Sequence, residues 1–482
     1  MTTDTIKPYR FIIWCAATAA FLCSFDGSVV AVSLPSMARS MGAGMDIATW
    51  VTAGYMVALS CALLPAGRLV DRFGPFVIFQ WGFVGFALAS AGCSASPGIS
   101  ALILMRWLQG LVAGMLVVAA FAIIPRTVPA PERAGAFALL TVLSSIGISL
   151  GAPLGGFLTE YASWRWIFAI NIPVGLAAAI LVKQHVAPDQ IADTATSKEL
   201  DPIATLAGAV ALATALIALN RVGMWGWTNS KTLLLCGVSV FAGGWFSYRE
   251  RIGTAPLIAW EAFSSPIIRR GFTLATIAYL YLAGFQLLFP FYLVEHRGFS
   301  TAQVGGSLLA YSLPLMAAGS LSARISRRFG LHRTQAAAML LVSLGSLLLA
   351  LGTAPLLLFP GMAGCGIGFG LFTSPNNAAV MSGAAPGEQG RVAGTFQTLI
   401  RVSVASGAVC FEALQRQAST TLQRFAHTAP DADELGFRTA FLAGALLCLL
   451  VAGFAVRRLH EKEVSHLDTH IKSEADQLEG AA

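Results

Sequence analysis

The feature that most constrains this chain is a series of long apolar stretches that repeats from one end of it to the other. A helix needs about 20 mostly apolar residues to cross the hydrocarbon core of a bilayer. Fourteen stretches approach or exceed this length, and only 11% of the residues are charged, against about 25% in soluble domains. We therefore predict an all-α polytopic membrane protein with 14 spans. Their approximate limits are 11–35, 47–67, 76–95, 99–123, 135–158, 164–183, 203–220, 232–248, 271–293, 302–323, 335–352, 354–377, 391–412 and 437–456.

The distribution of Lys and Arg predicts the orientation. Because the number of spans is even, both termini should lie on one side of the membrane. If that side is the cytoplasm, inner loops and tails hold 21 of the 31 Lys and Arg residues, outer loops hold 8, and Arg106 and Arg401 lie within spans. This distribution follows the positive-inside rule. The net charge of +7 therefore indicates topology and not nucleic-acid binding, and we expect a multi-pass protein of the cytoplasmic (inner) membrane with both termini inside.

The sequence lacks the patterns typical of a metal site, a nucleotide site or a disulfide framework. Its eight cysteines fall nearly all within apolar stretches and form no Cys-x-x-Cys pair, which favours free buried thiols. None of the six lysines follows a glycine, so a phosphate-binding loop is excluded. We expect no cofactor, no metal, no ATP and no enzyme activity, so that a transport function, if the chain has one, would draw its energy from an ion gradient.

An internal repeat divides the chain. Gly67-Arg-Leu-Val-Asp-Arg-Phe-Gly74 closes the second span, and Ala323-Arg-Ile-Ser-Arg-Arg-Phe-Gly330 closes the tenth in a similar way. If the two are equivalent, six spans precede a two-helix insert and six follow it, as in secondary transporters built from duplicated halves. The predicted parts are a first half at 1–185, a linker with two added helices at 186–268, a second half at 269–460 and a tail at 461–482.

Five motifs in order carry a family resemblance. They are Asp26-Gly-Ser-Val-Val-Ala-Val-Ser-Leu-Pro35, the Gly67–Gly74 segment, Arg106-Trp-Leu-Gln109-Gly110, Gly147-Ile-Ser-Leu-Gly151-Ala-Pro153-Leu-Gly155-Gly156 and Trp164-Arg-Trp-Ile-Phe-Ala-Ile-Asn171-Ile-Pro173. Together with the span count, they resemble the fourteen-helix drug:proton antiporter branch of the major facilitator superfamily. The resemblance implies two six-helix halves plus two inserted transmembrane helices, alternating access, and proton-coupled efflux.

The chain departs from the family pattern at two places in the repeated motif. Pro75 and Phe76 follow Gly74 where the family usually has two basic residues, and Arg327 replaces the aspartate in the second copy. These departures bear on how far charged residues of this motif close the cytoplasmic side of the transporter.

The residues Gly67, Asp71, Arg72 and Gly74 allow two interpretations. They could form a tight turn whose arginines only follow the positive-inside rule. Alternatively, Asp71 could act as a cytoplasmic latch that pairs with cations or with a helix N-terminus when the inner side is closed. The two interpretations have similar weight on the sequence alone.

The fifth span contains a stripe of glycines that could gate the transporter. Gly147, Gly151, Gly155 and Gly156 lie at helical spacing, so they would expose backbone along one stripe where another helix can approach closely. Pro153 adds a possible bend. Taken alone the stripe would indicate ordinary small-residue packing, whereas the resemblance implies a hinge characteristic of antiporters.

Asp26 and Arg106 are the candidate proton-coupling residues. Asp26 lies nine residues before Pro35 and Arg106 seven residues after Ile99, which places both about 11–13 Å from the outer surface. Pairing is the natural arrangement for two opposite charges at this depth. A fixed salt bridge that only sets helix register is the alternative, but the cost of intramembrane charges favours a functional role.

The remaining polar residues within spans are candidates for a substrate cavity. Arg401 could bind substrate, or it could contact backbone carbonyls or snorkel to the interface. The amides could equally satisfy neighbouring helices, and the aromatic series of the ninth span could be a core or lipid-facing stripe. The candidates are Gln109, Asn171, Tyr279, Gln286, Asn376, Asn377 and Arg401.

The sequence thus predicts an exporter of small amphipathic organic compounds that exchanges them for protons. The alternative within transporters is a dedicated exporter of one metabolite or antibiotic. A channel or a membrane receptor without transport fits less well, because the halves are duplicated and the spans are accompanied by no sizeable soluble domain.

Overall fold

The computed structural model describes residues 8–185, 201–253, 256–352, 355–425 and 432–456, and these residues are folded as helices joined by short connections. Six long helices form the first part, with two one-turn helices leading into α3 and α8. They are α1 (Pro8–Ser40), α2 (Met45–Ala48), α3 (Trp50–Phe73), α4 (Pro75–Ser94), α5 (Ile99–Thr127), α6 (Ala130–Tyr161), α7 (Trp166–Ala169) and α8 (Asn171–His185).

Two helices and a connecting segment follow, and then a second set of six long helices. The insert consists of α9 (Pro202–Trp225) and α10 (Ser230–Ile252), and the 3-10 helix η2 (Trp260–Ser264) leads out of it. The second set is α11 (Pro266–Arg297), the short α12 (Thr301–Ser307), α13 (Leu309–Phe329), α14 (Leu331–Leu351), α15 (Pro355–Ser382), α16 (Gln389–Phe425) and α17 (Ala432–Val456).

The two sets of helices pack in the same pattern. In the first set α1 packs on α6, α3 and α4 pack on α5, and α4 packs on α8. In the second set α11 packs on α16, α13 and α14 pack on α15, and α14 packs on α17. The repeated turns also match: Gly74 and Gly330 both have a φ of 84°, a left-handed conformation that glycine adopts readily. We call residues 8–185 the N-half and residues 266–456 the C-half.

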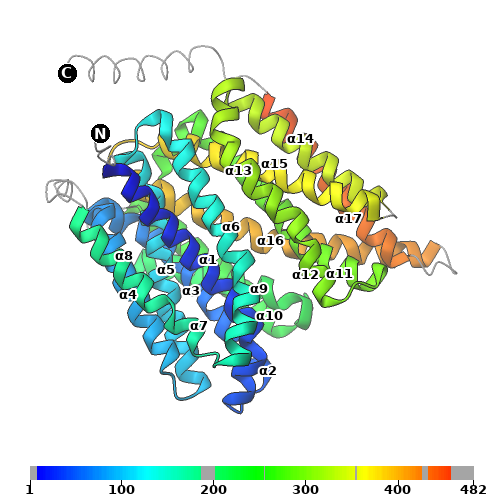
Figure 1. The fold of residues 1–482 in the computed structure, drawn as a ribbon, viewed down its shortest axis with the longest axis horizontal. Helices are drawn as coiled ribbons and strands as arrows, with labels where there is room; N and C mark the ends of the chain where they lie inside the picture. Colours follow the sequence, from blue (N-terminus) through cyan, green and yellow to red (C-terminus); the bar gives the residue numbers. More distant parts are fainter. Residues whose placement is uncertain (1–7, 186–200, 254–255, 353–354, 426–431, 457–482) are drawn as a thin grey trace, which may run out of the picture.

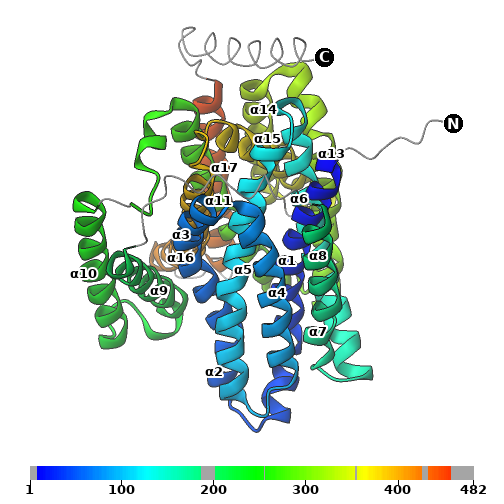
Figure 2. The same ribbon diagram turned by 90° about the vertical axis from the view of Figure 1, so that its left-hand side faces the viewer.

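The insert lies to one side of the bundle. Figure 2 shows α9 and α10 beside α3 and α16, and α9 packs against one helix of each half. The halves meet near the end at which α1 begins, and their helices diverge away from it (Figure 1). Tyr9, at the start of α1, donates to Glu132, at the start of α6, at 2.7 Å, so these helix starts share that end. We call it the N-terminal end of the bundle.

The predicted all-helical membrane fold is confirmed, whereas the count of fourteen spans is not. Among the described residues, 12 helices are long and apolar enough to cross a membrane. The two that fall short of this measure are α10, which carries three charges in its last turn, and α16, which is amphipathic and carries Arg401. The count of fourteen therefore remains a prediction. So does the domain division, whose boundaries at 185–186 and 460–461, and tail at 461–482, reach outside the described residues.

The connections around α10 provide a test of the span count. We expect alkaline phosphatase to be active when fused after Trp227, between α9 and α10, and inactive when fused after Gly253, because the last turn of α10 holds Arg249 and Arg251 and should face the cytoplasm. A green fluorescent protein fusion should give the opposite pattern. If both positions report the same side, α10 does not cross the membrane.

Candidate functional site

The first candidate site is a buried ion pair inside the N-half. Nη1 of Arg106, on α5, lies 2.5 Å from Oδ2 of Asp26, on α1, and both side chains are fully buried. The sequence placed these two charges at similar depth, and the structure brings them into contact. Because a lone charge in a bilayer is costly, mutual neutralisation is the physical reason that both can occupy this position.

Amide and hydroxyl side chains complete the network around this pair. Nε2 of Gln109 and Nδ2 of Asn171 both donate to Oδ1 of Asp26, at 3.2 Å and 3.1 Å. Gln109 also donates to Oγ of Ser90 at 2.8 Å and accepts from Arg106 at 2.6 Å. Gln109 and Asn171 were expected in a substrate cavity, but in this conformation both are buried. Their polar groups serve the Asp26 network.

The guanidinium of Arg106 is covered by aromatic rings. Its central carbon lies 4.0 Å from the ring centroid of Tyr55 and 5.6 Å from that of Phe168, distances at which cation–π attraction is favourable. Nε donates to the backbone oxygen of Val51 at 3.1 Å. Nη2 has no hydrogen-bond partner among the described residues. Arg106 therefore keeps one buried donor that a rearranged network could use.

The predicted glycine stripe packs against α1, the helix that carries Asp26. A Cβ on Gly147 would lie 2.7 Å from the backbone oxygen of Phe21. One on Gly155 would lie 2.8 Å from the backbone of α1, and one on Gly151 would overlap Oγ of Ser28. Atoms do not approach a Cβ this closely, so α6 accepts only glycine at these three positions while α1 stays where it is.

Serine hydroxyls on α1 join the same two helices. Oγ of Ser28 donates to the backbone oxygen of Gly147 at 3.2 Å, and Oγ of Ser33 donates to that of Gly155 at 3.4 Å. Ser33 also lies 2.7 Å from the hydroxyl of Thr159. Bare backbone on α6 and hydroxyls on α1 together fix the register of α1, the helix that carries Asp26, on α6.

Two members of the predicted stripe behave differently. Outside its own stretch of α6, no heavy atom of the described residues lies within 4 Å of a Cβ built on Gly156, so the prediction that Gly156 shares the close contact is wrong. It lies next to Gly155 in sequence, and adjacent helical residues point about 100° apart. Pro153 is exposed, and α6 runs unbroken past it from Ala130 to Tyr161.

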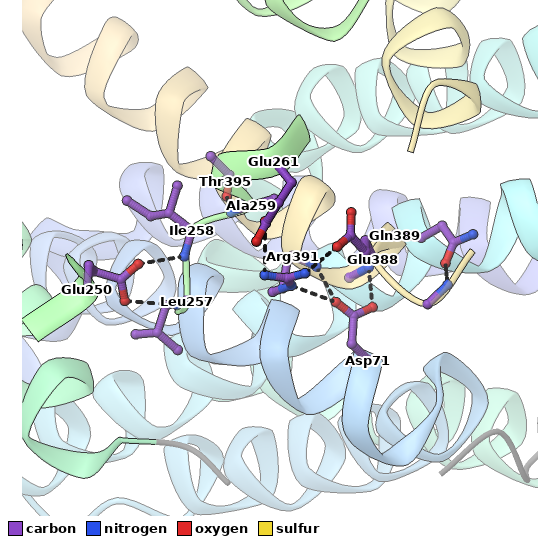
Figure 3. Close-up of polar contacts among 12 residues, drawn as sticks. Asp71, Glu250, Leu257, Ile258, Ala259, Glu261, Glu388, Gln389, Arg391 and Thr395 are labelled. Atoms are coloured by element: carbon purple, nitrogen blue, oxygen red, sulfur yellow. Dashed lines mark hydrogen bonds and ion pairs between the residues drawn. The ribbon is translucent and has the colours of Figure 1, made fainter. Parts of the chain in front are cut away.

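The second candidate site joins the halves at the N-terminal end. Asp71, at the end of α3, accepts hydrogen bonds from the backbone N–H groups of Gly390 at 2.7 Å and Arg391 at 2.9 Å, in the first turn of α16 (Figure 3). Arg126, on α5, lies 3.5 Å from the same carboxylate. A carboxylate at this position satisfies free N–H groups and complements the helix dipole. We call Asp71, Arg126, Gly390 and Arg391 the latch.

Glycines let α3 and α16 approach closely at the latch. A Cβ on Gly67 would lie 2.5 Å from the backbone oxygen of Gly390, and one on Gly390 would overlap that of Gly67. Gly74 provides the left-handed turn that follows α3. The guanidinium of Arg72 lies 5.1 Å from the ring centroid of Phe73. Of the four predicted gating residues in this motif, Gly67 and Asp71 therefore contact the C-half directly.

Other hydrogen bonds join the halves at the same end of the bundle, and one, between Ser374 and Thr141, lies deeper along α6 and α15. Arg327, which replaces the expected aspartate of the second motif copy, contributes one of them by donating to the N-half. These bonds are Arg126 to Gln389 at 3.2 Å, Arg133 to Ser382 at 3.3 Å, Arg327 to the backbone oxygen of Pro131 at 3.3 Å, and Ser374 to Thr141 at 3.4 Å.

Arg401 is the third charge that the sequence places within a span. It lies 12 residues after Gln389, the first residue of α16, or about 18 Å along the helix. Its Nε is buried and has no hydrogen-bond partner among the described residues. Helix α16, which carries Arg401, packs on α3 and α5 of the N-half and on α11 of the C-half. Arg401 therefore lies on a helix that contacts both halves, and its donor capacity is unused among the described residues.

The other cavity candidates fall into two groups. Asn376 is buried and accepts from Gln335 at 3.0 Å while donating to a backbone oxygen of α11 at 3.2 Å, and Asn377 is also buried. These two amides lie inside the C-half in this conformation. Tyr279 is half-buried, with its ring edge-on to Phe369, and Gln286 is exposed. Only the second group and Arg401 offer surface to a substrate.

Comparisons with known proteins identify the family. The family model described as Major Facilitator Superfamily matches residues 16–408. The chain belongs to the major facilitator superfamily. It is 28% identical to the tetracenomycin C resistance and export protein of Streptomyces glaucescens over 65% of this chain and 58% of that protein. It is 30% identical to the putative multidrug resistance protein MdtD of Serratia proteamaculans, over 70% of this chain and 69% of that one.

A solved structure supports the same fold. The human organic anion transporter MFSD10 superposes with a TM-score of 0.64 at 16% identity, over 93% of this chain and 99% of that one. At this identity the likeness shows the fold alone. The chain is thus a multi-pass membrane transporter whose relatives include export and multidrug resistance proteins.

Sequence reasoning missed several residues of these sites in this superfamily member. Tyr55 covers Arg106, Ser90 accepts from Gln109, and Arg391 belongs to the latch. The sequence singled out none of these three residues. Tyr55 and Ser90 are ordinary residues within apolar spans, and no periodicity distinguishes them. Arg391 had a usable signal, since it opens a span and could be assigned to the helix N-terminus that Asp71 was expected to meet.

Adjacent glycines of α6 give a matched pair for testing the contact with α1. We expect Gly155→Ala to destabilise the transporter by about 1–3 kcal/mol, because the new methyl group would meet the α1 backbone at 2.8 Å. Gly156→Ala should be neutral or stabilise by up to about 1 kcal/mol, since its methyl group enters open space and alanine favours the helix. Thermal unfolding in detergent measures both. Equal effects at the two positions would contradict the close contact.

Proposed function

We propose that this transporter exports small amphipathic organic compounds across the cytoplasmic membrane in exchange for protons, with both termini in the cytoplasm. Its membership of the superfamily and the names of its relatives support export of organic compounds. With that orientation, the N-terminal end of the bundle faces the cytoplasm, and the latch closes the inner side.

The observation that carries the proposal is the position of Asp26 in a chain of contacts to the C-half. Asp26 is fully buried on α1, and α1 is held against the glycine stripe of α6. The same helix α6 packs on α13 and α15. A change at Asp26 that shifts α1 therefore acts on a helix that also forms the interface between the halves.

Protonation supplies such a change. While Asp26 is ionised, it accepts from Arg106, Gln109 and Asn171. A proton on the carboxyl removes the charge that balances Arg106, and an uncompensated buried cation is strongly unfavourable. The network must then rearrange, and Nη2 of Arg106 has no hydrogen-bond partner in the described part of the chain. Proton uptake would thus favour a different packing of α1, α5 and α6, which is the property that coupling requires.

Arg401 suggests what part of the substrate is recognised. Among the charges inside the described spans, Asp26 and Arg106 neutralise each other, whereas Arg401 has no ion-pair or hydrogen-bond partner among the described residues. A buried donor of this kind favours a hydrogen-bond acceptor on the ligand. We propose that Arg401 binds an acceptor group of the substrate and that Tyr279 contacts its apolar part.

The contacts of Asp26 favour a second candidate function, the export of a single metabolite or antibiotic. The single carboxylate of the buried network is already occupied by three side-chain donors, which leaves no free acid for a range of cationic drugs. A substrate screen in a strain that lacks its own exporters would separate broad from narrow efflux.

Replacing Asp26 by Asn tests proton coupling. We expect Asp26→Asn to abolish substrate-induced release of a preformed pH gradient in everted vesicles while substrate binding is retained, because Asn cannot carry a proton. If Asp26 is only half of a static bridge, the change should instead cost about 3–5 kcal/mol and lower the yield. Rescue of the yield by also neutralising Arg106 would identify that case. A variant that still exchanges substrate for protons would remove Asp26 from the mechanism.

Replacing Arg401 tests substrate recognition. With a compound identified by the screen, we expect Arg401→Gln to raise the KM for efflux about tenfold or more, since a hydrogen bond to a charged donor contributes about 1.5–3 kcal/mol. Arg401→Lys should restore part of the affinity because it keeps the charge but loses the planar fork. The control is Arg416→Gln, which removes an exposed cation of the same helix. An unchanged KM in Arg401→Gln would exclude the contact.

A further inference from the structure

The inserted helices contain a buried carboxylate that the proposed function does not use. Glu250, in the last turn of α10, is 5% exposed. Its Oε1 accepts from the backbone N–H of Leu257 at 2.9 Å, and its Oε2 accepts from the backbone N–H of Ile258 at 3.1 Å and from Nε1 of Trp260 at 3.3 Å (Figure 3). One side chain thus binds two backbone donors between α10 and η2 and the indole of Trp260, the first residue of η2.

This held segment packs between the insert and both halves. Leu257 is 1% exposed and clusters with Phe246 of α10 and Leu64 of α3. The N–H of Ala259 donates to the hydroxyl of Thr395, on α16, at 3.4 Å. The segment therefore contacts α3 and α16, the two helices that the latch joins.

The same segment delivers a second carboxylate to the latch. Oε2 of Glu261, in η2, lies 3.5 Å from Nη1 of Arg391. Arg391 also binds Glu388 at 2.5 Å, while its backbone N–H donates to Asp71. Carboxylates from the N-half, the connecting segment and the C-half thus converge on Arg391, as Figure 3 shows.

The ion pair between Glu261 and Arg391 depends on a backbone that holds Glu261 in place. The Glu261 side chain is 64% exposed, and an exposed ion pair contributes little when both side chains must be ordered from a mobile state. The pair contributes more if the backbone that carries Glu261 is already fixed. Glu250 provides that fixation by binding Leu257, Ile258 and Trp260, just before Glu261 in the chain, through a buried carboxylate whose donors are all within 3.3 Å.

We propose that Glu250 is a positioning residue of the latch, and that the two-helix insert stabilises the closed inner end through the segment 257–261. This inference rests on the function proposed above, in which the latch closes the inner side of the transporter. Glu250 fixes the segment, the segment presents Glu261 to Arg391, and Arg391 keeps the start of α16 on Asp71. The insert contributes to the closed state without touching substrate or proton site.

The test measures the opening of the N-terminal end directly. Spin labels are attached through genetically encoded unnatural amino acids at Phe73, on α3, and Arg324, on α13, which are both exposed. Double electron–electron resonance on the full chain in nanodiscs then gives the ratio of open to closed populations. No substrate or proton gradient is needed, so a failure of this inference is distinguishable from a failure of proton-coupled export.

Two variants probe the two ends of the connection. Glu250→Gln removes the charge and at least one acceptor atom, and we expect the open-to-closed ratio to rise about two- to fivefold, the scale of a weak ion pair. Glu261→Gln changes an exposed side chain that folding does not need, and it should raise the ratio similarly. The double variant should match the larger single effect, because both residues act through Arg391.

Asp201→Asn is the matched control within the insert. Asp201 caps α9 and pairs with Arg249 at 2.7 Å, and its bonds from the backbone N–H of Ala204 and from Arg249 lower the pKa of its carboxyl. Asparagine keeps the cap and loses the ion pair, so the variant should leave the ratio unchanged. An unchanged ratio in Glu250→Gln and Glu261→Gln, or an equal rise in Asp201→Asn, would overturn the proposal. Additive effects in the double variant would also overturn it, since they would show independent action.

Discussion

The absence of water from the bilayer core determines how the N-half is built. Asp26 and Arg106 are each too costly to leave unpaired at that depth, and their contact at 2.5 Å requires α1 and α5 to lie side by side. Gln109 and Asn171 both donate to the other oxygen of the carboxylate, and Asn171 adds α8 to the arrangement. A single electrostatic requirement thus fixes three helices around one buried point.

Two helices connect this point with the interface between the halves. Helix α6 holds α1 on its glycine stripe and packs against α13 and α15 on another face. Helix α3 covers Arg106 with Tyr55 and carries Asp71 of the latch 16 residues later, or about 24 Å along its axis. The buried Asp26–Arg106 pair and the latch are therefore linked by rigid elements.

The differences between expectation and structure have one cause. Gln109 and Asn171 were expected to face a cavity because polar residues in spans often do, yet a nearby carboxylate gave them a better partner inside the bundle. Gly156 was grouped with Gly155 because both are small, yet only one side of α6 faces α1. In both cases the sequence identified residues able to make a contact, and the direction of each side chain decided whether it did.

The sequence by itself determined the helical membrane fold, the internal repeat, the presence of two opposite charges, Asp26 and Arg106, within spans, and the glycines that allow close approach. These follow from local properties: the length of an apolar run, the cost of a buried charge and the absence of a side chain. Only the tertiary structure decided that the stripe meets α1, that Asp71 binds the start of α16, and that Glu250 holds the segment beside Arg391. Each of these contacts joins residues on different helices or across a connection, and the partner of a side chain there depends on how the helices are packed and rotated, which no local pattern encodes.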